Sequence, residues 1–301
     1  MLKNKFFTAE EVKPGVWQIT NCFNSHARMN TFCYLVEGQT RALVIDTMYG
    51  YGNLHAFCRE LTDKPLTLVC THYHGDHAGG CFDFDACYMH ALDIPFMRDT
   101  VRRAQEDPTA YAQARFAQMK NASLPEYADS ILPGDVCLAK PFYFWPIWDG
   151  DSFDLGGKTI EVVHVGGHTP GEIVLVDRAD RLCFTGDACN DNTLLNLPGS
   201  ISVEEYREFL THFKSFQSAF DTCFGGHIVA ENTILDEAIE TVDRVLARTD
   251  DKEVSTGLGG RTCLYGGLRK PGTFIRENGM RFNIAYTEDN IFKTERKPQK
   301  L

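Results

Sequence analysis

Hydrophobic and polar positions alternate with a period of two along the first third of the chain. The alternation is clearest in residues 15–20, 29–38 and 41–47, and turn-forming residues separate these runs. A period of two predicts β-strands with one polar and one apolar face. Residues 53–61 instead have helical spacing, and the apolar run 65–70 predicts a short buried strand. The pattern therefore predicts a sheet of consecutive strands that gives way to alternating strands and helices.

A different pattern occupies residues 97–148. Its first part is polar and helix-prone but is broken by prolines, and its last part is dense in aromatic residues. We interpret this segment as a helical and aromatic insertion. Strand patterns then return, separated by helices that we expect to begin at about Ser202 and Asn232. Residues 251–301 are glycine-rich and strand-like, and we expect a hairpin over residues 272–292.

The chain has neither a low-complexity linker nor a repeat with a period of 20 to 50 residues. We therefore expect one α/β domain over residues 1–301, with two sheets or layers and helices outside them. Residues 97–148 would be its insertion, and residues 251–301 its C-terminal extension.

Composition places the chain among ordinary globular proteins. It has 301 residues, of which 43% are hydrophobic and 24% charged. A net charge of −11 disfavours nucleic acid as a partner, and no run approaches the roughly 18 apolar residues of a membrane span. The first residues lack the apolar run of a signal peptide, and the eleven cysteines include no C-x-x-C pair. We expect a cytoplasmic protein with reduced thiols and a small-molecule substrate, and the sequence is compatible with a homodimer.

The stretch THYHGDHAGG, residues 71–80, carries the strongest chemical pattern in the chain. Imidazole and carboxylate are usual ligands of zinc and similar metals. His72 and His74 follow the strand predicted at 65–70, so we expect their side chains to face one point. We expect Gly75 to allow a sharp turn that directs Asp76 and His77 to a second point.

Three further candidate ligands lie in glycine-flanked loops after strand-like runs: His168, Asp187 and His227. Seven ligands exceed the needs of one tetrahedral ion and suit two. One ion would take His72, His74 and His168, and the other Asp76, His77 and His227. A carboxylate has two oxygens, so Asp187 can bridge the ions, with water at the remaining bridging position. Such a pair of ions lowers the pKa of the water and provides a hydroxide for attack on an electrophile.

Taken in order, THYHGDHAGG, GGHTPG, FTGDA and GGH resemble the motifs of the metallo-β-lactamase superfamily over about residues 15–227. The resemblance implies an αββα sandwich with a dinuclear metal site at one edge of two packed sheets. It also implies that Asp46, in RALVIDT, lies near the site without being a ligand.

The aspartate at position 187 is similar to that of glyoxalase II, lactonases and RNase Z, whereas the commonest zinc β-lactamases have cysteine there. The resemblance therefore favours a zinc hydrolase that cleaves an ester-like bond, in a lactone or a thioester, with Asp76 orienting the hydroxide or moving its proton. Alternatives are an iron enzyme of sulfur or oxygen redox chemistry and a phosphodiesterase, with iron or manganese as alternative metals. β-Lactam hydrolysis is less favoured.

Several residues have two interpretations. The aromatic run 142–148 packs in the core or forms a hydrophobic wall beside the metals. Basic C-terminal residues bind a substrate carboxylate or lie on the surface: Arg261, Arg269, Lys270, Arg276 and Arg281. We expect Cys189 to be a buried neutral thiol and His55, His90, His164 and His212 to be structural, while His26 lies in a loop that can border the site.

Overall fold

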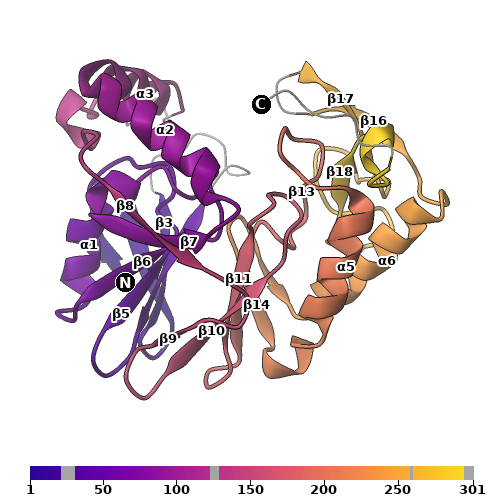
Figure 1. Ribbon diagram of the computed structural model, residues 1–301, viewed down its shortest axis with the longest axis horizontal. Helices are drawn as coiled ribbons and strands as arrows, with labels where there is room; N and C mark the ends of the chain where they lie inside the picture. Colours follow the sequence, from indigo (N-terminus) through magenta and orange to yellow (C-terminus); the bar gives the residue numbers. More distant parts are fainter. Residues whose placement is uncertain (22–30, 123–128, 258–259, 295–301) are drawn as a thin grey trace. The chain divides into compact units, whose positions relative to one another are not determined.

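The computed structural model describes residues 1–21, 31–122, 129–257 and 260–294. It divides into two compact units, whose elements are labelled in Figure 1. Each unit has its own hydrophobic core. Unit 1 comprises Met1–Ile147 with Ser152–Ile160, and unit 2 comprises Trp148–Asp151 with Glu161–Leu301. The prediction of a single domain over residues 1–301 stays a prediction.

Unit 1 is built on an eight-stranded sheet in the order β1-β2-β3-β4-β5-β6-β7-β8. Neighbouring strands are antiparallel from β1 to β5 and parallel from β5 to β8. The strands are β1 (Leu2–Lys3), β2 (Phe7–Lys13), β3 (Val16–Asn21), β4 (Phe32–Glu37), β5 (Ala42–Ile45), β6 (Leu66–Val69), β7 (Ala86–His90) and β8 (Tyr143–Ile147). The strands predicted from alternation are thus confirmed as β3, β4 and β5, and the buried run as β6.

The helix expected over residues 53–61 is confirmed as α1 (Leu54–Leu61), which connects the parallel strands β5 and β6. The Asn53 side chain caps it by accepting a hydrogen bond from the Ala56 N–H at 2.8 Å. Leu54 and Phe57 are buried against the core of unit 1. Because β5 and β6 are parallel, the residues that follow them emerge at the same edge of the sheet.

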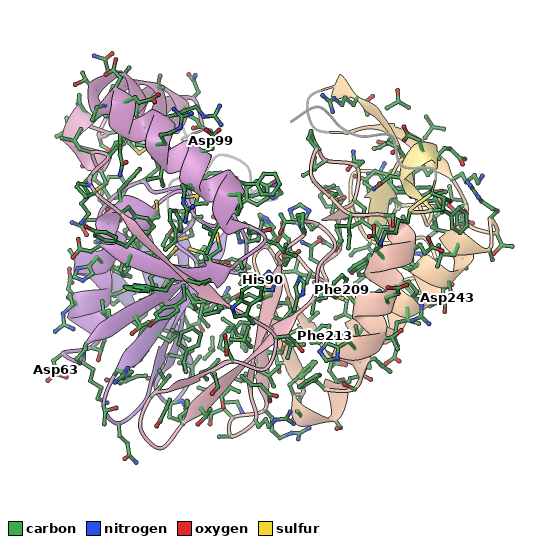
Figure 2. All side chains as sticks on the ribbon, in the orientation of Figure 1. Asp63, His90, Asp99, Phe209, Phe213 and Asp243 are labelled. Carbon is green, nitrogen blue, oxygen red and sulfur yellow. The ribbon has the colours of Figure 1, made fainter. Side chains whose placement is uncertain are left out.

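The helical part of the predicted insertion consists of α2 (Ile94–Glu106) and α3 (Pro108–Ala122), which pack against each other (Figure 1). Met97 and Val101 of α2 are buried. Asp99, labelled in Figure 2, lies on the outer face of α2 and pairs with Arg102 and Arg103 at 2.7 and 2.6 Å. This amphipathic distribution explains why the segment is polar in sequence yet packs as a helix.

The aromatic end of the segment is an edge strand, because β8 pairs with β7 alone among the described strands. Tyr143, Trp145 and Trp148 are exposed, whereas Phe142 is buried and forms an edge contact with Phe82. The run is therefore divided between packing in the core and surface exposure.

The described residues of unit 2 form two sheets and two α-helices. The first sheet has the order β15-β14-β12-β11-β10, and the second the order β13-β18-β17-β16. The strands after β8 are β9 (Ser152–Asp154), β10 (Thr159–His164), β11 (Ile173–Asp177), β12 (Leu182–Gly186), β13 (Thr193–Leu194), β14 (Thr222–Gly225), β15 (Val229–Glu231), β16 (Glu253–Thr256), β17 (Thr262–Tyr265) and β18 (Ile284–Tyr286). The helices are α5 (Val203–Lys214) and α6 (Ile234–Leu246), and 3₁₀ helices lie at Cys81–Asp83, Pro133–Asp135, Gln217–Ala219 and Glu288–Asn290.

Helix α5 begins as the sequence predicts. Ser202 and Glu205 form a reciprocal capping box at its first turn, with the Glu205 N–H donating to Ser202 Oγ at 3.2 Å. Phe213, labelled with Phe209 in Figure 2, is fully buried in the core of unit 2. Strands β12 and β14 are parallel, so the residues after Gly186 and Gly225 emerge at one edge of their sheet.

The hairpin predicted over residues 272–292 is wrong. Within that stretch the structure has a single strand, β18, which pairs with β17 on one side and β13 on the other. A tight turn does form at Gly279, whose N–H donates to the Arg276 carbonyl at 2.9 Å, but no pair of described strands flanks it. The hairpin of this region is instead β16–β17.

Among the helices of the described residues, none combines the length and the apolar character that crossing a bilayer requires.

Candidate functional site

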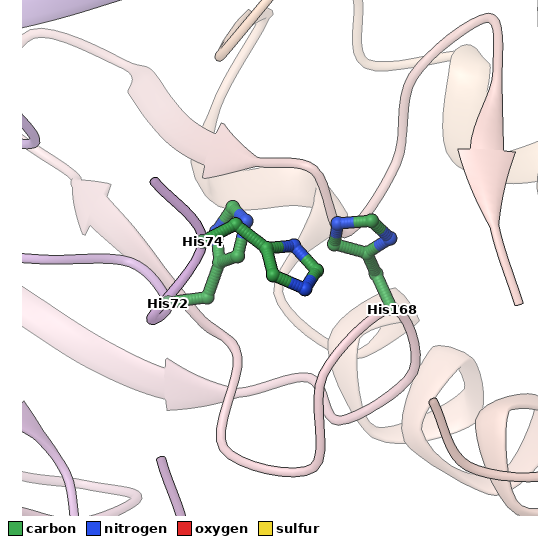
Figure 3. Close-up of side chains that lie close together, drawn as sticks. All are labelled: His72, His74 and His168. Atoms are coloured by element: carbon green, nitrogen blue, oxygen red, sulfur yellow. The ribbon is translucent and has the colours of Figure 1, made fainter. Parts of the chain in front are cut away.

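The predicted ligands of unit 1 lie in the loop that follows β6. His72 is fully buried and His74 is partly exposed, and their ring centroids are 4.9 Å apart (Figure 3). The rings of His72 and His77 are closer, with centroids 4.1 Å apart. The candidate ligand atoms of Asp76 and His77 lie within 4.8 Å of each other. The structure thus gathers all four predicted ligands of this unit in one loop.

Asp46, directly after β5, braces this loop. Its Oδ1 accepts the Thr71 N–H at 2.7 Å, and its Oδ2 lies 2.8 Å from His77 Nδ1. A carboxylate only accepts hydrogen bonds, so His77 carries its proton on Nδ1 and presents the lone pair of Nε2. This contact agrees with the resemblance, which places Asp46 beside the ligands and not among them.

The chain turns at Gly75 as predicted, with the His77 and Ala78 N–H groups donating to the His74 carbonyl at 3.0 and 2.8 Å, but the packing of the loop requires glycine at position 79 and not at position 75. Gly75 is exposed, has no positive φ, and a Cβ placed on it would meet nothing within 4 Å. A Cβ on Gly79, in contrast, would lie 2.2 Å from the Gly75 carbonyl oxygen and 2.7 Å from the Tyr49 backbone. Glycine is therefore required where the loop packs against its neighbours and not where Asp76 begins.

The predicted ligands of unit 2 come together around Asp187. Asp187 Oδ2 lies 3.5 Å from His168 Nε2, and Asp187 Oδ1 lies 3.5 Å from His227 Nε2. His168 extends from the loop after β10 (Figure 3), and the other two residues follow β12 and β14. Each oxygen of the carboxylate thus faces a different imidazole, which is the arrangement a bridging ligand requires.

Hydrogen bonds hold the His168 side chain and the backbone beside Asp187 and His227. His168 Nδ1 lies 2.8 Å from the Leu194 carbonyl oxygen, an acceptor, so Nδ1 carries the proton and Nε2 presents its lone pair toward Asp187. The Asp187 N–H donates to Glu172 Oε1 at 2.7 Å. The two glycine turns are joined by a 2.8 Å hydrogen bond from the Gly226 N–H to the Gly186 carbonyl.

The chemistry and spacing of these donors fit a first-row metal ion. Two ligands of one tetrahedral zinc ion, with zinc–nitrogen and zinc–oxygen bonds near 2.1 Å, lie about 3.3–3.5 Å apart. The two 3.5 Å separations around Asp187 match that spacing. The prediction that all seven ligands of both units share one dinuclear site stays a prediction.

Other histidines and Cys189 have the structural roles expected of them. His164 Nε2 lies 2.8 Å from the Pro170 carbonyl oxygen and its ring packs on Phe209, so it supports the loop that carries His168. Burial raises the pKa of the Cys189 thiol well above its usual value, which keeps it neutral. His26 lies outside the described residues.

Two of the basic C-terminal residues are held by internal partners. Arg276 is 1% exposed and donates to Glu240 at 2.9 Å and to Thr241 at 2.8 Å. Arg269 pairs with Glu253 at 2.7 Å. Because Arg276 is buried, both the surface interpretation and the binding interpretation are wrong for it, whereas for Arg269 the two interpretations stay predictions.

Sequence reasoning missed the groups that brace the ligands. Glu172 and the Leu194 carbonyl of unit 2 are two examples. In unit 1, the Tyr73 N–H donates to Asp93 at 3.2 Å, and the Tyr73 ring stacks on Phe96 with centroids 4.7 Å apart. No motif identifies these residues, although an acidic residue such as Glu172, directly after GGHTPG, is a weak indication of a group that supports the site.

The sequence matches a family model described as the metallo-beta-lactamase superfamily over residues 27–86 and 117–221, more than half of the chain.

The relatives of the chain include proteins that are named as thioesterases. The human acyl-coenzyme A thioesterase MBLAC2 is 28% identical over 221 residues, which cover 67% of this chain and 73% of that protein. The Gallus gallus protein of the same name is 26% identical over 218 residues, with the same coverage. Atrochrysone carboxyl ACP thioesterase nsrC of Aspergillus novofumigatus is 26% identical over 192 residues, covering 62% of this chain but only 45% of that protein.

Solved metallo-beta-lactamases share the fold. DIM-1 metallo-beta-lactamase is 16% identical, with a TM-score of 0.56 over 80% of this chain and 98% of that one. The enzyme from Pontibacter korlensis is 17% identical, with a TM-score of 0.51 over 79% and 99%. These likenesses confirm the predicted α/β fold class.

Proposed function

Because the chain belongs to the metallo-β-lactamase superfamily and is one of its hydrolases, we propose that it cleaves acyl thioesters at a site that holds two zinc ions. The observation that carries this proposal is the position of Asp187, whose two oxygens lie 3.5 Å from His168 and His227. A carboxylate held between two imidazoles is suited to bridge two ions.

The proposed site assigns ligands from both units. One ion would be held by His72, His74 and His168, and the other by Asp76, His77 and His227, with Asp187 bound to both. Asp46 and the Leu194 carbonyl support this assignment because they fix the ring nitrogens that His77 and His168 present.

When bound, two zinc ions would lower the pKa of a water molecule toward neutrality and polarise the substrate carbonyl. Asp76 would orient the attacking water and accept its proton. Hydrolysis consumes one water, breaks the bond between the acyl carbon and sulfur, and releases a carboxylic acid and a thiol. The buried loops on which His72 and Asp187 lie would hold the reacting groups in place.

The thioester is favoured over the lactone by the relatives. MBLAC2 is named an acyl-coenzyme A thioesterase and nsrC an ACP thioesterase. The carrier thiol would be coenzyme A or a phosphopantetheine group of the same chemistry.

The experiment is thioester hydrolysis by purified protein of known metal content. Zinc-loaded wild-type protein should contain about two zinc ions per chain and release free thiol from acyl-coenzyme A, and Asp187→Ala should reduce kcat at least about a thousandfold. His72→Ala should do the same while retaining the circular dichroism spectrum of the wild type.

His212→Ala is the matched control, because His212 is a half-exposed histidine of α5 that pairs with Asp149. It should keep full activity. Absence of thioester hydrolysis by the zinc-loaded wild type, or retention of most activity by Asp187→Ala, would overturn the proposal.

A further inference from the structure

An apolar pocket of about 210 Å³ lies within unit 1, between the loop of the predicted ligands and helices α2 and α3. Its wall includes His74, Phe82, Met97, Val101, Tyr111 and Arg115. Of these, His74 belongs to the proposed metal site and Arg115 is the one cation. The pocket therefore lies next to the proposed metal ligand His74, on the side of helices α2 and α3.

Fixed contacts hold this wall against the ligand loop. The Tyr73 N–H donates to Asp93, the residue before α2, and the Tyr73 ring stacks on Phe96 in the first turn of α2. On the other helix, the Tyr111 ring meets Phe82 edge-on, with centroids 5.7 Å apart. Because α2 and α3 are anchored next to His74, the shape of the pocket is tied to the position of that ligand.

Arg115 gives the pocket one polar feature. Its Nη1 donates to Gln118 Oε1 at 2.8 Å, and its guanidinium lies 5.1 Å from the centre of the Tyr51 ring. The Nε and Nη2 atoms are buried, and among the described residues they donate to no acceptor. A buried donor without an acceptor is costly. Because Arg115 lines the pocket, a rotation of its side chain would bring these N–H groups to an oxygen of a bound ligand and remove that cost.

We propose that this pocket binds the acyl group of the thioester substrate, and that Arg115 selects acyl groups that carry a carboxylate or carbonyl oxygen on their chain. This inference rests on the proposed thioester hydrolysis and specifies which thioesters the enzyme prefers.

Size and chemistry support this occupant. Pockets that enclose a whole drug-sized ligand measure about 300–1,000 Å³, so 210 Å³ suits an acyl group and not an entire coenzyme A thioester. The wall is mainly apolar, as a hydrocarbon chain requires, and a guanidinium forms its strongest hydrogen bonds with carboxylate oxygens. A site with one such donor discriminates strongly against the analogue that lacks the acceptor.

The first test compares adipoyl-coenzyme A with hexanoyl-coenzyme A, which have the same chain length and differ in a terminal carboxylate. Wild-type enzyme should prefer adipoyl-coenzyme A in kcat/KM, and Arg115→Met should reduce that preference by about tenfold or more. Arg115→Lys, which keeps the charge, should retain part of the preference for adipoyl-coenzyme A. Gln113→Met, an exposed change on the same helix, should leave the preference unaltered.

The second test narrows the pocket without touching its buried wall. Thr100 lines the pocket but is exposed, so Thr100→Trp should be tolerated by the fold. It should reduce kcat/KM for hexanoyl- and adipoyl-coenzyme A by about tenfold while acetyl-coenzyme A is affected less than about twofold. Arg98→Trp, exposed on α2 and absent from the wall, is the matched control.

The outcomes separate the two proposals. If the zinc-loaded wild type hydrolyses no thioester, the proposed function fails and this inference fails with it. If it hydrolyses thioesters but neither Arg115→Met nor Thr100→Trp changes the ratio between substrates, the pocket does not bind the acyl group and this inference alone is overturned.

Discussion

Asp46 joins two neighbouring strand ends through a single side chain. It receives the Thr71 N–H on one oxygen and faces His77 Nδ1 with the other, and its own backbone has a φ of 63°. Asparagine tolerates that backbone conformation as well as aspartate does. Replacing Asp46 by asparagine therefore removes the charge and one hydrogen-bond acceptor with little backbone strain.

Asp46→Asn should weaken zinc binding by about 10- to 100-fold while the fold is retained. The amide group of asparagine donates, so it cannot replace the second carboxylate oxygen as an acceptor from His77 Nδ1. His77 would then favour the other tautomer and lose the lone pair on Nε2. Competition with a calibrated chelator measures the affinity, and an unchanged zinc affinity would show that Asp46 does not position His77.

The two glycines of the loop should respond differently to alanine. Gly79→Ala should lower the free energy of unfolding of zinc-free protein by about 3 kcal/mol, because its Cβ would overlap the backbone at Gly75 and Tyr49. Gly75→Ala should change it by less than about 0.5 kcal/mol. Urea denaturation compares the two variants, and equal effects would contradict the packing described here.

At this scale the sequence predicts residue chemistry better than residue contacts. His72, Asp187 and the other candidate ligands are recognisable because imidazole and carboxylate groups recur after strand-like runs. Glu172 and Asp93 were missed because their roles depend on which backbone N–H each carboxylate meets in the folded chain. The need for glycine at position 79 is likewise absent from the sequence pattern, because the close approach of Gly79 to Tyr49 is a tertiary contact.

Elements defined by local interactions follow from the sequence. Helices α1 and α5 begin where Asn53 and Ser202 provide side-chain caps, and both signals are local. The error at residues 272–292 has the opposite origin. Strand β18 gains its partners from β13 and β17, and its parallel partner, β13, is remote in sequence, so local alternation could not locate the pairing.

The junction between α1 and the 3₁₀ helix at Cys81–Asp83 should respond to pH. Burial raises the pKa of Asp83 to about 6, against the opposing effect of the hydrogen bond from the Leu54 N–H. The folded state then holds a proton that the unfolded state has released, so this residue destabilises the fold as pH rises from about 4 to 6.

Asp83→Asn removes that titration and keeps an oxygen acceptor for Leu54. The free energy of unfolding of the variant should rise relative to that of the wild type as the pH increases from 4 to 6. At pH 7 the difference should be of the order of 1–3 kcal/mol. Urea unfolding of both proteins at a series of pH values measures this difference. A difference between the two proteins that does not depend on pH would contradict this assignment.

For the molecule as a whole, the proposed site draws its ligands from both units. The net charge of −11 agrees with the preference for a small-molecule substrate over nucleic acid, and that preference stays a prediction, as do the homodimer and the cytoplasmic location.

Removal of zinc should therefore destabilise both units. A ligand that binds the folded state alone stabilises it by about 4 kcal/mol at a concentration one thousand times its Kd. Dialysis against a chelator should lower Tm by several degrees, and added zinc should restore it, whereas the Asp187→Ala variant should show a smaller shift. Equal Tm values with and without zinc, at verified metal contents, would argue against ions held by ligands of both units.

The central claim is that seven side chains from separate loops hold two zinc ions. Anomalous X-ray diffraction from crystals of the zinc-loaded protein, recorded on both sides of the zinc absorption edge, measures this most directly. We predict two anomalous peaks per chain, one beside His72, His74 and His168 and one beside Asp76, His77 and His227, with Asp187 between them. A single peak, no peak, or peaks remote from Asp187 would contradict the account.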